Sequence, residues 1–403
     1  MADILILTPQ APFPPRQGTA LRNWGILRGL AAEHRVSLLT FAAADQASAP
    51  LAPLEAVTAR LAIVPQPARS MRTRLRDLLI NPRPDLTLRL DTAAFRAQLE
   101  TWLATYDFDW IMVEGLELAG YLDAVWSRPS PPRVIFDDHN CEYLLQKRAF
   151  MTDLRHPPRW IGAAYSCVQW QRLRRYEAEI CRRADLVVAV SEADAQALER
   201  IVPGLDPLVV PNGVDVATFS AFTDEAPLEQ PAFVFTGTMD FRPNVDGVLW
   251  FAHEVWPRIR AELPRACFYI VGRHPHDRLA CLRDAPGIII TGGVPDTRPY
   301  INGALVYVVP LLVGGGTRLK LLESTAMGKA IVSTTLGAEG FERPGEVMAL
   351  ADDPVAFAAA CVYLARNTPA RSQLGKRAQV FATNYDWSTL LPPLLEKIAS
   401  TST

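Results

Sequence analysis

A glycine-rich segment followed by charged residues at helical spacing is the part of the sequence best suited to chemistry. It reads Gly314-Gly315-Gly316-Thr317-Arg318-Leu319-Lys320 and continues to Glu323. Consecutive glycines let backbone N–H groups approach an anion, and a helix that begins there adds a partial positive charge. Thr317, Lys320 and Glu323 share one helix face. Lys320 could neutralise a diphosphate and Glu323 could accept hydrogen bonds from sugar hydroxyls; the alternative is a glycine turn with a solvated charged face.

Two polar side chains in the first half come at or shortly after the ends of short apolar runs. Glu114 follows Trp110–Val113, and His139 comes shortly after Val134–Phe136. If these runs are parallel strands, both side chains emerge at carboxyl strand ends, where open α/β sheets bind ligands. A histidine with a structural role and an acid that caps a helix are the ordinary alternatives for these positions.

The elements that must position these residues alternate along the chain as short apolar runs and longer amphipathic stretches. Continuous apolar runs favour strands buried on both faces, as in parallel sheets covered by helices. Because the alternation occurs in both halves, it predicts an α/β fold with two Rossmann-like doubly wound domains facing each other across a cleft. The predicted strands are Ile4–Leu7, Val36–Phe41, Leu61–Val64, Trp110–Val113, Val134–Phe136, Leu186–Val190, Phe233–Thr236, Cys267–Val271, Ile288–Thr291, Leu305–Val309 and Ala330–Ser333.

The stretch from Val202 to Pro231 is the natural break between the two halves. It is rich in proline and acidic residues, and it contains the turn signal Pro211-Asn212-Gly213. We therefore predict one domain over residues 1–205 and a second over residues 206–387. A helix at about 388–403 is expected to pack back on the first domain.

Composition places the chain among ordinary globular proteins. Its 403 residues are 49% hydrophobic and 21% charged, with a formal net charge of −2, which gives no general reason to bind nucleic acid. The six cysteines form no C-x-x-C pair, a pattern typical of reduced thiols in the cytoplasm. No apolar run approaches the roughly 20 residues of a membrane span. We expect a cytoplasmic protein, or one that is peripheral at the inner face of the membrane.

Two arginine-rich stretches, residues 69–89 and 159–183, contain interleaved apolar and aromatic residues. Such a mixture predicts peripheral contact with an anionic membrane surface. The alternative is that the apolar residues of the second stretch form the buried stripe of a surface helix. That stripe would consist of Trp160, Ile161, Ala164, Val168 and Leu173. We expect no nucleic-acid partner, because no recognition motif accompanies the basic residues.

Further motifs occur in a fixed order along nearly the whole chain. They are a Pro-rich loop with Gly18, Asp138-His139-Asn140, Ala184-Asp185, Val190-Ser191-Glu192, Val210-Pro211-Asn212-Gly213-Val214-Asp215, Gly237-Thr238-Met239-Asp240, Pro243-Asn244, Val271-Gly272 and Tyr385-Asp386-Trp387. Together with the segment from Gly314 to Glu323, they resemble the family-4-type retaining glycosyltransferases of the GT-B fold, the bacterial group 1 type of sugar transferase.

The resemblance implies transfer of a hexosyl unit from a UDP-, GDP- or ADP-sugar to a glycan, lipid-linked or small-molecule acceptor, without a metal or another cofactor. It implies donor binding in the second domain, with Glu323 at the ribose and Val294 beside the base. It also implies that His139, Arg318 and Lys320 act in catalysis and that Glu114 contacts the acceptor. The remaining implied donor-binding residues are Gly18, Gly237, Thr238, Gly272, Arg273, Gly315, Gly316 and Thr317.

Two departures from the family pattern bear on the donor site. Gly315 stands where many members have an acid, and Thr238 stands where many have an arginine. No lysine follows within residues 239–244. Neutralisation of the diphosphate is then expected to fall on Arg318 and Lys320.

Other readings of the sequence remain open at this point. A nucleotide-sugar epimerase or a phosphorylase could use the same fold, the latter needing Lys320 or Lys329 for pyridoxal phosphate. A homologue that binds nucleotide or glycan without turnover would fit the two departures. Asp107-x-Asp109 resembles a metal motif but precedes a predicted strand, so we expect it to lie away from the cleft. Leu7-Thr8-Pro9 replaces the glycine turn that a dinucleotide oxidoreductase requires.

Overall fold

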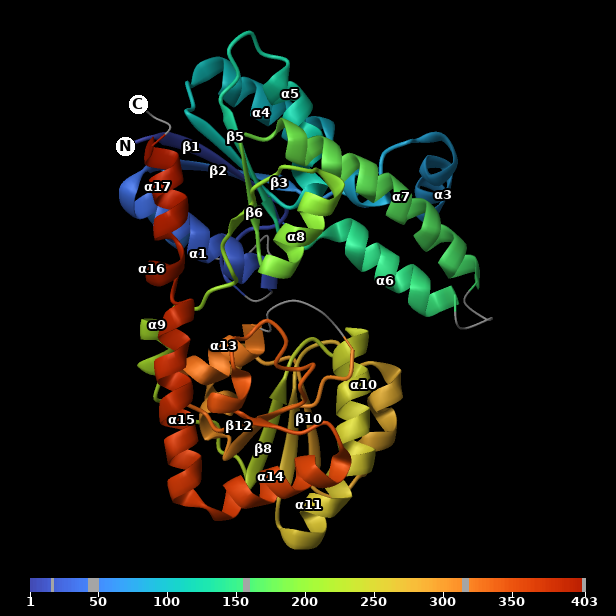
Figure 1. Ribbon diagram of the computed structural model, residues 1–403, viewed down its shortest axis with the longest axis vertical. Coiled ribbons are helices and arrows are strands. Elements are labelled where there is room, and N and C mark those ends of the chain that lie inside the picture. The colour runs from blue at the N-terminus through green and yellow to red at the C-terminus, as the bar shows by residue number, and fades with distance from the viewer. Residues whose placement is uncertain (16–17, 43–50, 155–159, 314–318, 401–403) are drawn as a thin grey trace. The chain divides into compact units, whose positions relative to one another are not determined.

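A computed structural model describes residues 1–15, 18–42, 51–154, 160–313 and 319–400. The chain forms two compact units, Met1–Pro211 with Leu391–Thr403, and Asn212–Leu390. Each unit has a parallel sheet with helices on both faces (Figure 1). The predicted fold class, two α/β domains with doubly wound parallel sheets, is confirmed.

The sheet of the first unit has the strand order β3-β2-β1-β4-β5-β6-β7. Its strands are β1 (Asp3–Thr8), β2 (Arg35–Ala42), β3 (Arg60–Pro65), β4 (Trp110–Glu114), β5 (Arg133–Asp138), β6 (Leu186–Ala189) and β7 (Leu208–Val209). The central strands are buried along nearly their full length because helices cover both faces. The chain order changes direction between β1 and β4, which makes this pair the switch point of the sheet.

Most helices of the first unit connect these strands in sequence, and the last one follows the second unit along the chain. They are α1 (Gly18–Glu33), α2 (Ala52–Val57), α3 (Met71–Ile80), α4 (Ala93–Thr105), α5 (Leu122–Trp126), α6 (Glu142–Leu154), α7 (Trp160–Arg183), α8 (Glu192–Ile201) and α17 (Pro392–Ser400), with short 3₁₀ turns at Asp85–Leu88 and Leu116–Tyr121. The last helix, α17, lies beside α1 (Figure 1). A β-carbon added to Gly29 of α1 would lie 2.0 Å from Leu391 Cδ1, so the glycine permits this close approach.

The second unit repeats the arrangement with the strand order β10-β9-β8-β11-β12-β13. Its strands are β8 (Ala232–Thr236), β9 (Cys267–Val271), β10 (Ile288–Gly292), β11 (Val306–Val309), β12 (Ile331–Ser333) and β13 (Ala349–Leu350). Its helices are α9 (Val216–Ser220), α10 (Arg242–Trp250), α11 (Trp256–Glu262), α12 (Arg298–Gly303), α13 (Leu319–Ala326), α14 (Pro354–Arg366), α15 (Thr368–Ala382) and α16 (Trp387–Leu390). The switch point lies between β8 and β11.

Short irregular turns complete the second unit. A π-helical turn at Phe251–Val255 joins α10 to α11, and 3₁₀ turns lie at Asp277–Leu282, Pro344–Glu346 and Thr383–Tyr385. None of the described helices combines the length and the hydrophobicity that crossing a membrane requires.

Candidate functional site

A buried polar cluster lies at the carboxyl ends of β4 and β5 in the first unit. Glu114, the last residue of β4, is in register with Asp137 near the end of β5. Both side chains are fully buried, and the helix α1, which follows β1, places Arg22 and Asn23 against them. The cluster therefore sits at the carboxyl edge of this sheet, next to its switch point, where such folds bind ligands.

Arg22 holds Asp137 through two parallel hydrogen bonds. Its Nε and Nη2 donate to the two oxygens of Asp137, each at 2.7 Å, and Nη1 donates to the Val210 carbonyl at 2.9 Å. Burial by itself would raise the pKa of Asp137, but the adjacent Arg22 outweighs it and lowers the pKa below its usual range. Asp137 therefore stays ionised and fixes α1 to the sheet.

His139 lies directly above this pair and contacts two carboxylates. Its Nε2 is 2.8 Å from Glu114 Oε2 and 3.5 Å from Asp137 Oδ2. Burial opposes the charge on His139, but its hydrogen bonds to Asp137 and Glu114 outweigh burial and raise the pKa to about 10. Asn23, oriented with its amide nitrogen toward the acceptors, donates to Glu114 Oε2 at 2.9 Å. The imidazolium is thus held as a cationic hydrogen-bond donor.

Glu114 is a buried carboxyl whose second oxygen is unused. Burial, and then the charge of Asp137, raise its pKa to about 7, against the opposing effect of His139. Its Oε1 has no hydrogen-bond partner among the described residues. Glu114 therefore contacts His139 rather than forming a cap on a helix, and the predicted acceptor contact stays a prediction.

A second buried acidic group lies beside the first. Asp138, Cys141 and Glu177 place their ligand atoms within 4.8 Å of one another. Glu177 accepts the backbone N–H groups of Glu142 and Tyr143 at 2.8 and 3.0 Å, which satisfies the first turn of α6. Neither oxygen of Asp138 has a hydrogen-bond partner within the described ranges.

Both carboxyls of this second group are held toward the neutral form. Burial, followed by the negative charge of Glu177, raises the pKa of Asp138 well above its usual value. Burial also raises the pKa of Glu177, to about 8. A proton shared between these two side chains would satisfy the otherwise unpaired oxygens.

Neither group fits a resident metal ion well. In the first, Glu114, Asp137 and His139 have suitable spacing, but a metal would have to displace Arg22 from Asp137 and deprotonate His139. In the second, both Glu177 oxygens are already used by α6. Asp109 of the Asp-x-Asp sequence accepts the Asp3 N–H at 2.8 Å, so it ties the amino ends of two strands together.

In the second unit, Lys320 on α13 lies over the carboxyl end of β8. Its Nζ donates to Asn244 Oδ1 at 2.8 Å and lies 4.0 Å from the centre of the Phe235 ring. Gly237, just after β8, leaves room for this placement, because a β-carbon there would lie 2.9 Å from Lys320 Nζ. Asn244 in turn donates to the Thr238 carbonyl at 2.9 Å. Lys320 is therefore held at the switch point of its sheet.

The loops after β8, β9 and β10 are joined by backbone hydrogen bonds. Gly237 N–H donates to Val271 O at 3.0 Å, Gly272 N–H to Gly292 O at 3.1 Å, and Met239 N–H to Arg273 O at 2.9 Å. A β-carbon on Gly272 would lie 1.7 Å from the Gly237 carbonyl oxygen. Only glycine lets these loops approach so closely.

Glu323 is one turn beyond Lys320 on the same face of α13. Burial raises its pKa to about 7, although Lys320 and Arg298 lower it. Arg298 is itself paired with Asp296, at 2.7 Å. The two charges of the predicted stripe therefore share one face, and Glu323 can ionise near neutral pH.

The structure locates the predicted site residues in two groups. His139 and Glu114 are in contact in the first unit, and exposed Gly18 begins α1 there. Gly237, Thr238, Gly272, Arg273, Lys320 and Glu323 lie on adjoining loops and on α13 in the second unit, and Val294 packs on its core after β10. The predicted residues Gly315, Gly316, Thr317 and Arg318 lie outside the described residues.

Sequence reasoning missed several residues of these sites. Arg22, Asn23 and Asp137 support His139, while Asn244 and Arg298 flank Lys320 and Glu323. One signal was available for Arg22: it stands on the mostly apolar helix that follows the first strand, where a buried cation needs an acid at a neighbouring strand end.

Two family models match the chain. The description "Glycosyltransferase Family 4" applies to residues 17–218, about half of the chain, and "Glycosyl transferases group 1" applies to residues 230–367. A phosphatidyl-myo-inositol mannosyltransferase of Mycolicibacterium smegmatis is 31% identical over 232 residues, which are 54% of this chain and 57% of that protein. The chain spans about half the length of the curated relatives that it matches, 45% and 57% for the first two.

Solved structures show the same fold at low sequence identity. Anabaena HepE in complex with UDP-glucose aligns with 14% identity and a TM-score of 0.64, covering 99% of this chain and 100% of HepE. A TarM variant of S. aureus, in complex with fondaparinux, α-GlcNAc-glycerol and UDP, aligns with 10% identity and a TM-score of 0.65, covering 99% and 100%.

Proposed function

The chain belongs to glycosyltransferase family 4, and a group 1 glycosyl transferase model matches its second half. From this premise we propose that it is a retaining hexosyltransferase. It takes the hexosyl unit from a nucleoside-diphosphate sugar and passes it to a glycan, lipid-linked or small-molecule acceptor, without a metal. We assign donor binding to the unit Asn212–Leu390 and acceptor binding to the unit Met1–Pro211. HepE binds UDP-glucose, which makes UDP the first nucleotide to test.

The placement of Lys320 is the observation that carries the proposal. Its ammonium group is fixed by Asn244 and by the Phe235 ring, beside Glu323 and at the carboxyl end of β8. A fixed cation beside a carboxylate matches the needs of a nucleoside diphosphate, with its anionic phosphates and its ribose hydroxyls. Lys320 binds phosphate, and Glu323 accepts hydrogen bonds from the ribose.

Departure of the nucleotide builds negative charge on the leaving phosphate oxygen. A cation already positioned there favours the transition state over the bound substrate. His139 is a cationic donor near neutral pH, held by Glu114 and Asp137, and it donates a hydrogen bond to the transferred sugar.

Thermal stabilisation by UDP, GDP and ADP tests the donor site first. We expect one nucleotide to raise the melting temperature of the wild-type protein, and the shift to disappear in Lys320→Ala and in Glu323→Ala. Lys376→Ala is the matched control, because Lys376 is exposed on α15 of the same unit. A shift that survives in both site variants would overturn the assignment.

Turnover separates this function from its alternatives. With the selected nucleotide-sugar and an acceptor, Lys320→Ala should lower turnover by about 10²–10³-fold without unfolding the protein. Retention requires that the new glycosidic bond keep the anomeric configuration of the donor, which NMR of the product reports. Conversion of the donor without an acceptor would indicate an epimerase, and nucleotide binding without any conversion would indicate a homologue that only binds.

A further inference from the structure

The paired helices α6 and α7 of the first unit end in an exposed apolar tip. The two helices pack along each other and extend beyond the sheet of their unit (Figure 1). At their far end the exposed fractions are 46% for Met151, 50% for Leu154, 58% for Trp160 and 91% for Ile161. These four residues are called the hairpin tip below.

The hairpin tip does not belong to a buried stripe. Of the residues expected in that stripe, Leu173 is buried, but Trp160, Ile161, Ala164 and Val168 are exposed. The face of α7 that packs inward consists instead of Ala163, Ser166, Gln169 and Leu173. The buried-stripe alternative is therefore wrong for the first half of α7, and these apolar side chains face outward at a cost in hydration free energy.

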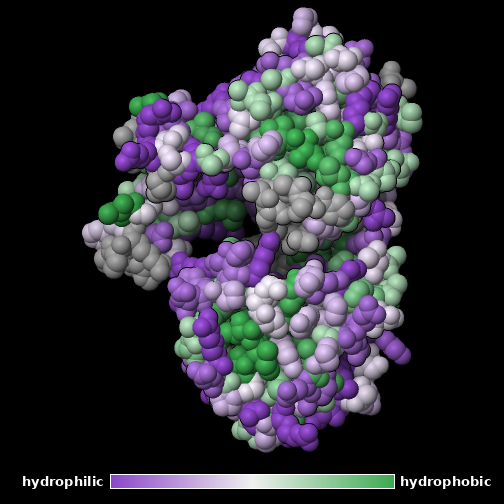
Figure 2. All heavy atoms as spheres, turned by 180° about the vertical axis from the view of Figure 1, so that it is seen from behind, coloured by the Kyte–Doolittle hydropathy of each residue, from purple (hydrophilic) through white to green (hydrophobic). Residues whose placement is uncertain are grey.

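Basic residues accompany this outward apolar surface. Lys147 and Arg148 on α6 are exposed and form no ion pair with another described residue, although Lys147 Nζ lies 5.4 Å from the centre of the Trp170 ring. Arg174 and Arg175 are also exposed, about four turns beyond the hairpin tip along α7. Figure 2 shows hydrophobic and hydrophilic residues side by side where this end of the unit projects. An apolar tip with exposed cations on the same two helices is complementary to a surface that is anionic outside and apolar inside.

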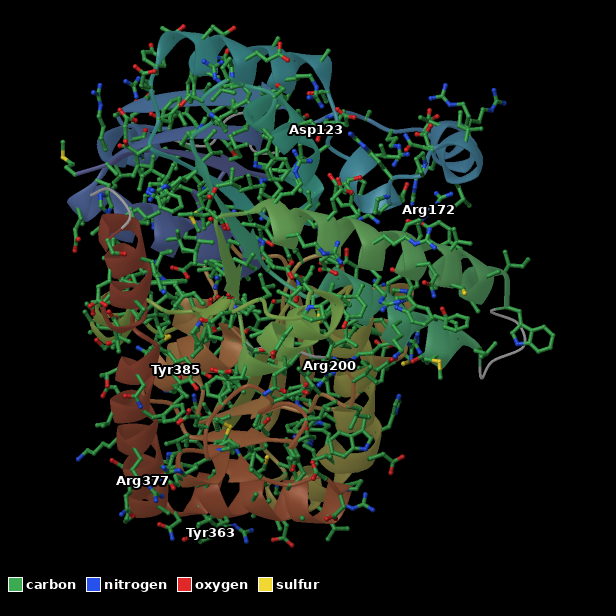
Figure 3. All side chains as sticks on the ribbon, turned by 45° about the horizontal axis from the view of Figure 1, so that its top comes forward. Asp123, Arg172, Arg200, Tyr363, Arg377 and Tyr385 are labelled. Carbon is green, nitrogen blue, oxygen red and sulfur yellow. The ribbon has the colours of Figure 1, made fainter. Side chains whose placement is uncertain are left out.

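The other arginine-rich stretch has a different role. Arg69 pairs with Asp77 and Asp85, and Arg83 pairs with Asp123. Arg172, on the side of α7 near α3, donates to the Leu78 carbonyl at 2.8 Å (Figure 3). Several arginines of residues 69–89 thus hold α3 and the following turn in place, although Arg72 and Arg76 remain exposed.

We propose that the hairpin tip docks on an anionic lipid bilayer. The side chains of Met151, Leu154, Trp160 and Ile161 enter the headgroup boundary, and Lys147 and Arg148 contact lipid phosphates. Trp160 suits this boundary, because its indole N–H already donates to the Leu154 carbonyl at 3.3 Å while its ring stays exposed. The proposal is independent of the donor site, which lies in the other unit.

Vesicle binding of the full chain tests the proposal. We expect co-sedimentation with vesicles of phosphatidylcholine plus phosphatidylglycerol, and little with phosphatidylcholine alone. The double variant Leu154→Glu/Ile161→Glu should lower the partition coefficient by about tenfold or more, because it places acids where apolar side chains enter. The double variant Lys147→Glu/Arg148→Glu should also lower the partition coefficient, because it removes the attraction of two basic residues to anionic lipid, on the order of 1 kcal/mol per residue.

Val380→Glu is the matched control, since Val380 is 72% exposed on α15 of the other unit. It should bind vesicles like the wild-type protein. All variants alter exposed side chains, so an unchanged melting temperature confirms that they fold, and an unchanged nucleotide response keeps this test separate from the donor site.

Three results would overturn the docking surface. The first is equal vesicle binding by the wild-type protein and both double variants. The second is equal binding of the wild-type protein to both kinds of vesicle. The third is a soluble dimer that the double variants convert to monomers without any effect of lipid. Tryptophan fluorescence tests the position of the indole itself. If vesicles shift the emission of the wild-type protein to shorter wavelength but do not shift that of Trp160→Phe, the Trp160 ring lies in the lipid boundary.

Discussion

At the scale of single residues, Asp137 and Asp138 are adjacent carboxyls in opposite states. Asp137 faces Arg22 and stays ionised, while Asp138 faces Glu177 and has a pKa raised well above its usual value. The difference arises from alternation along β5, since successive side chains point to opposite faces of a sheet. One residue thus anchors α1, and the next packs against α7.

This contrast predicts different costs for the same substitution. A raised pKa in the folded state stabilises the protein in acid, and that stabilisation is lost as pH rises through the raised pKa. We therefore expect Asp138→Asn to change the free energy of unfolding little near pH 6. Between about pH 6 and pH 9 the wild-type protein should lose more unfolding free energy than the variant, because the neighbouring Glu177 has a pKa of about 8 and ionises in this range. Urea denaturation at the two ends of this range measures the difference.

Asp137→Asn is the control for that measurement. It leaves the buried Arg22 guanidinium without its anion, which should cost about 3–5 kcal/mol of unfolding free energy at every pH in the range. Equal losses in the two variants would show that Asp138 is ionised in the folded protein.

The pKa of Glu323 predicts a pH dependence for nucleotide binding. Glu323 accepts hydrogen bonds best when ionised, and its pKa is about 7. The dissociation constant for the nucleotide should therefore fall by up to about tenfold as pH rises from about 6 to about 8. Glu323→Gln should bind more weakly and lose this dependence; calorimetric titration of both proteins provides the test. A Gln variant with the wild-type slope would assign the titration to the nucleotide phosphate.

At the scale of elements, two glycines on neighbouring loops have separate roles. A β-carbon on Gly237 would meet the ends of two side chains, Asn244 and Lys320, whereas one on Gly272 would meet the Gly237 backbone carbonyl. Side-chain ends can shift, but a backbone that is hydrogen-bonded on both sides cannot.

Gly237→Ala should displace Lys320 and weaken nucleotide binding, and it should also cost some stability because the backbone φ of +158° at this position suits glycine. Gly272→Ala should lower the unfolding free energy by about 1–3 kcal/mol or more, because overpacking has no side chain to absorb it. Chemical denaturation and nucleotide titration of both variants separate these outcomes. If Gly272→Ala mainly weakened nucleotide binding and Gly237→Ala caused the larger loss of unfolding free energy, the close approach of the two loops described above would be contradicted.

The elements show what the sequence can and cannot predict. Apolar runs such as Trp110–Val113 and Cys267–Val271 correctly predicted β4 and β9, because a strand buried on both faces needs a continuous apolar run. The edge strands β7 and β13 were missed because each has only two residues and carries no such run.

The candidate sites were predicted less completely. Spacing along α13 and at strand ends pointed to Lys320, Glu323 and His139 as candidates, but not to the residues that contact them in the structure. Arg22 lies 115 residues from Asp137 in the sequence, and no local pattern connects residues so far apart. For Trp160 and Ile161 the sequence left both an exposed and a buried position open, because helical periodicity does not say which face is covered.

At the scale of the whole molecule, the two ends of the chain meet in the first unit. Leu391, Leu394 and Ile398 are buried there although they follow the entire second unit. Leu394→Ala should lower the stability of the first unit by about 2–5 kcal/mol. Hydrogen exchange should show faster opening in α1 and not in β8 or β9. Faster exchange confined to the second unit would contradict this assignment of α17.

The return of α17 to α1 also sets an order of events during translation. Residues 212–390 leave the ribosome before the segment that covers α1 exists, and synthesis proceeds at about 5–20 residues per second. The second unit can therefore complete its fold while the first, begun earlier, still waits for its final helix. During that interval the apolar side of α1 around Gly29 is exposed, so a nascent chain stalled before Leu391 should be a better chaperone substrate than the released protein.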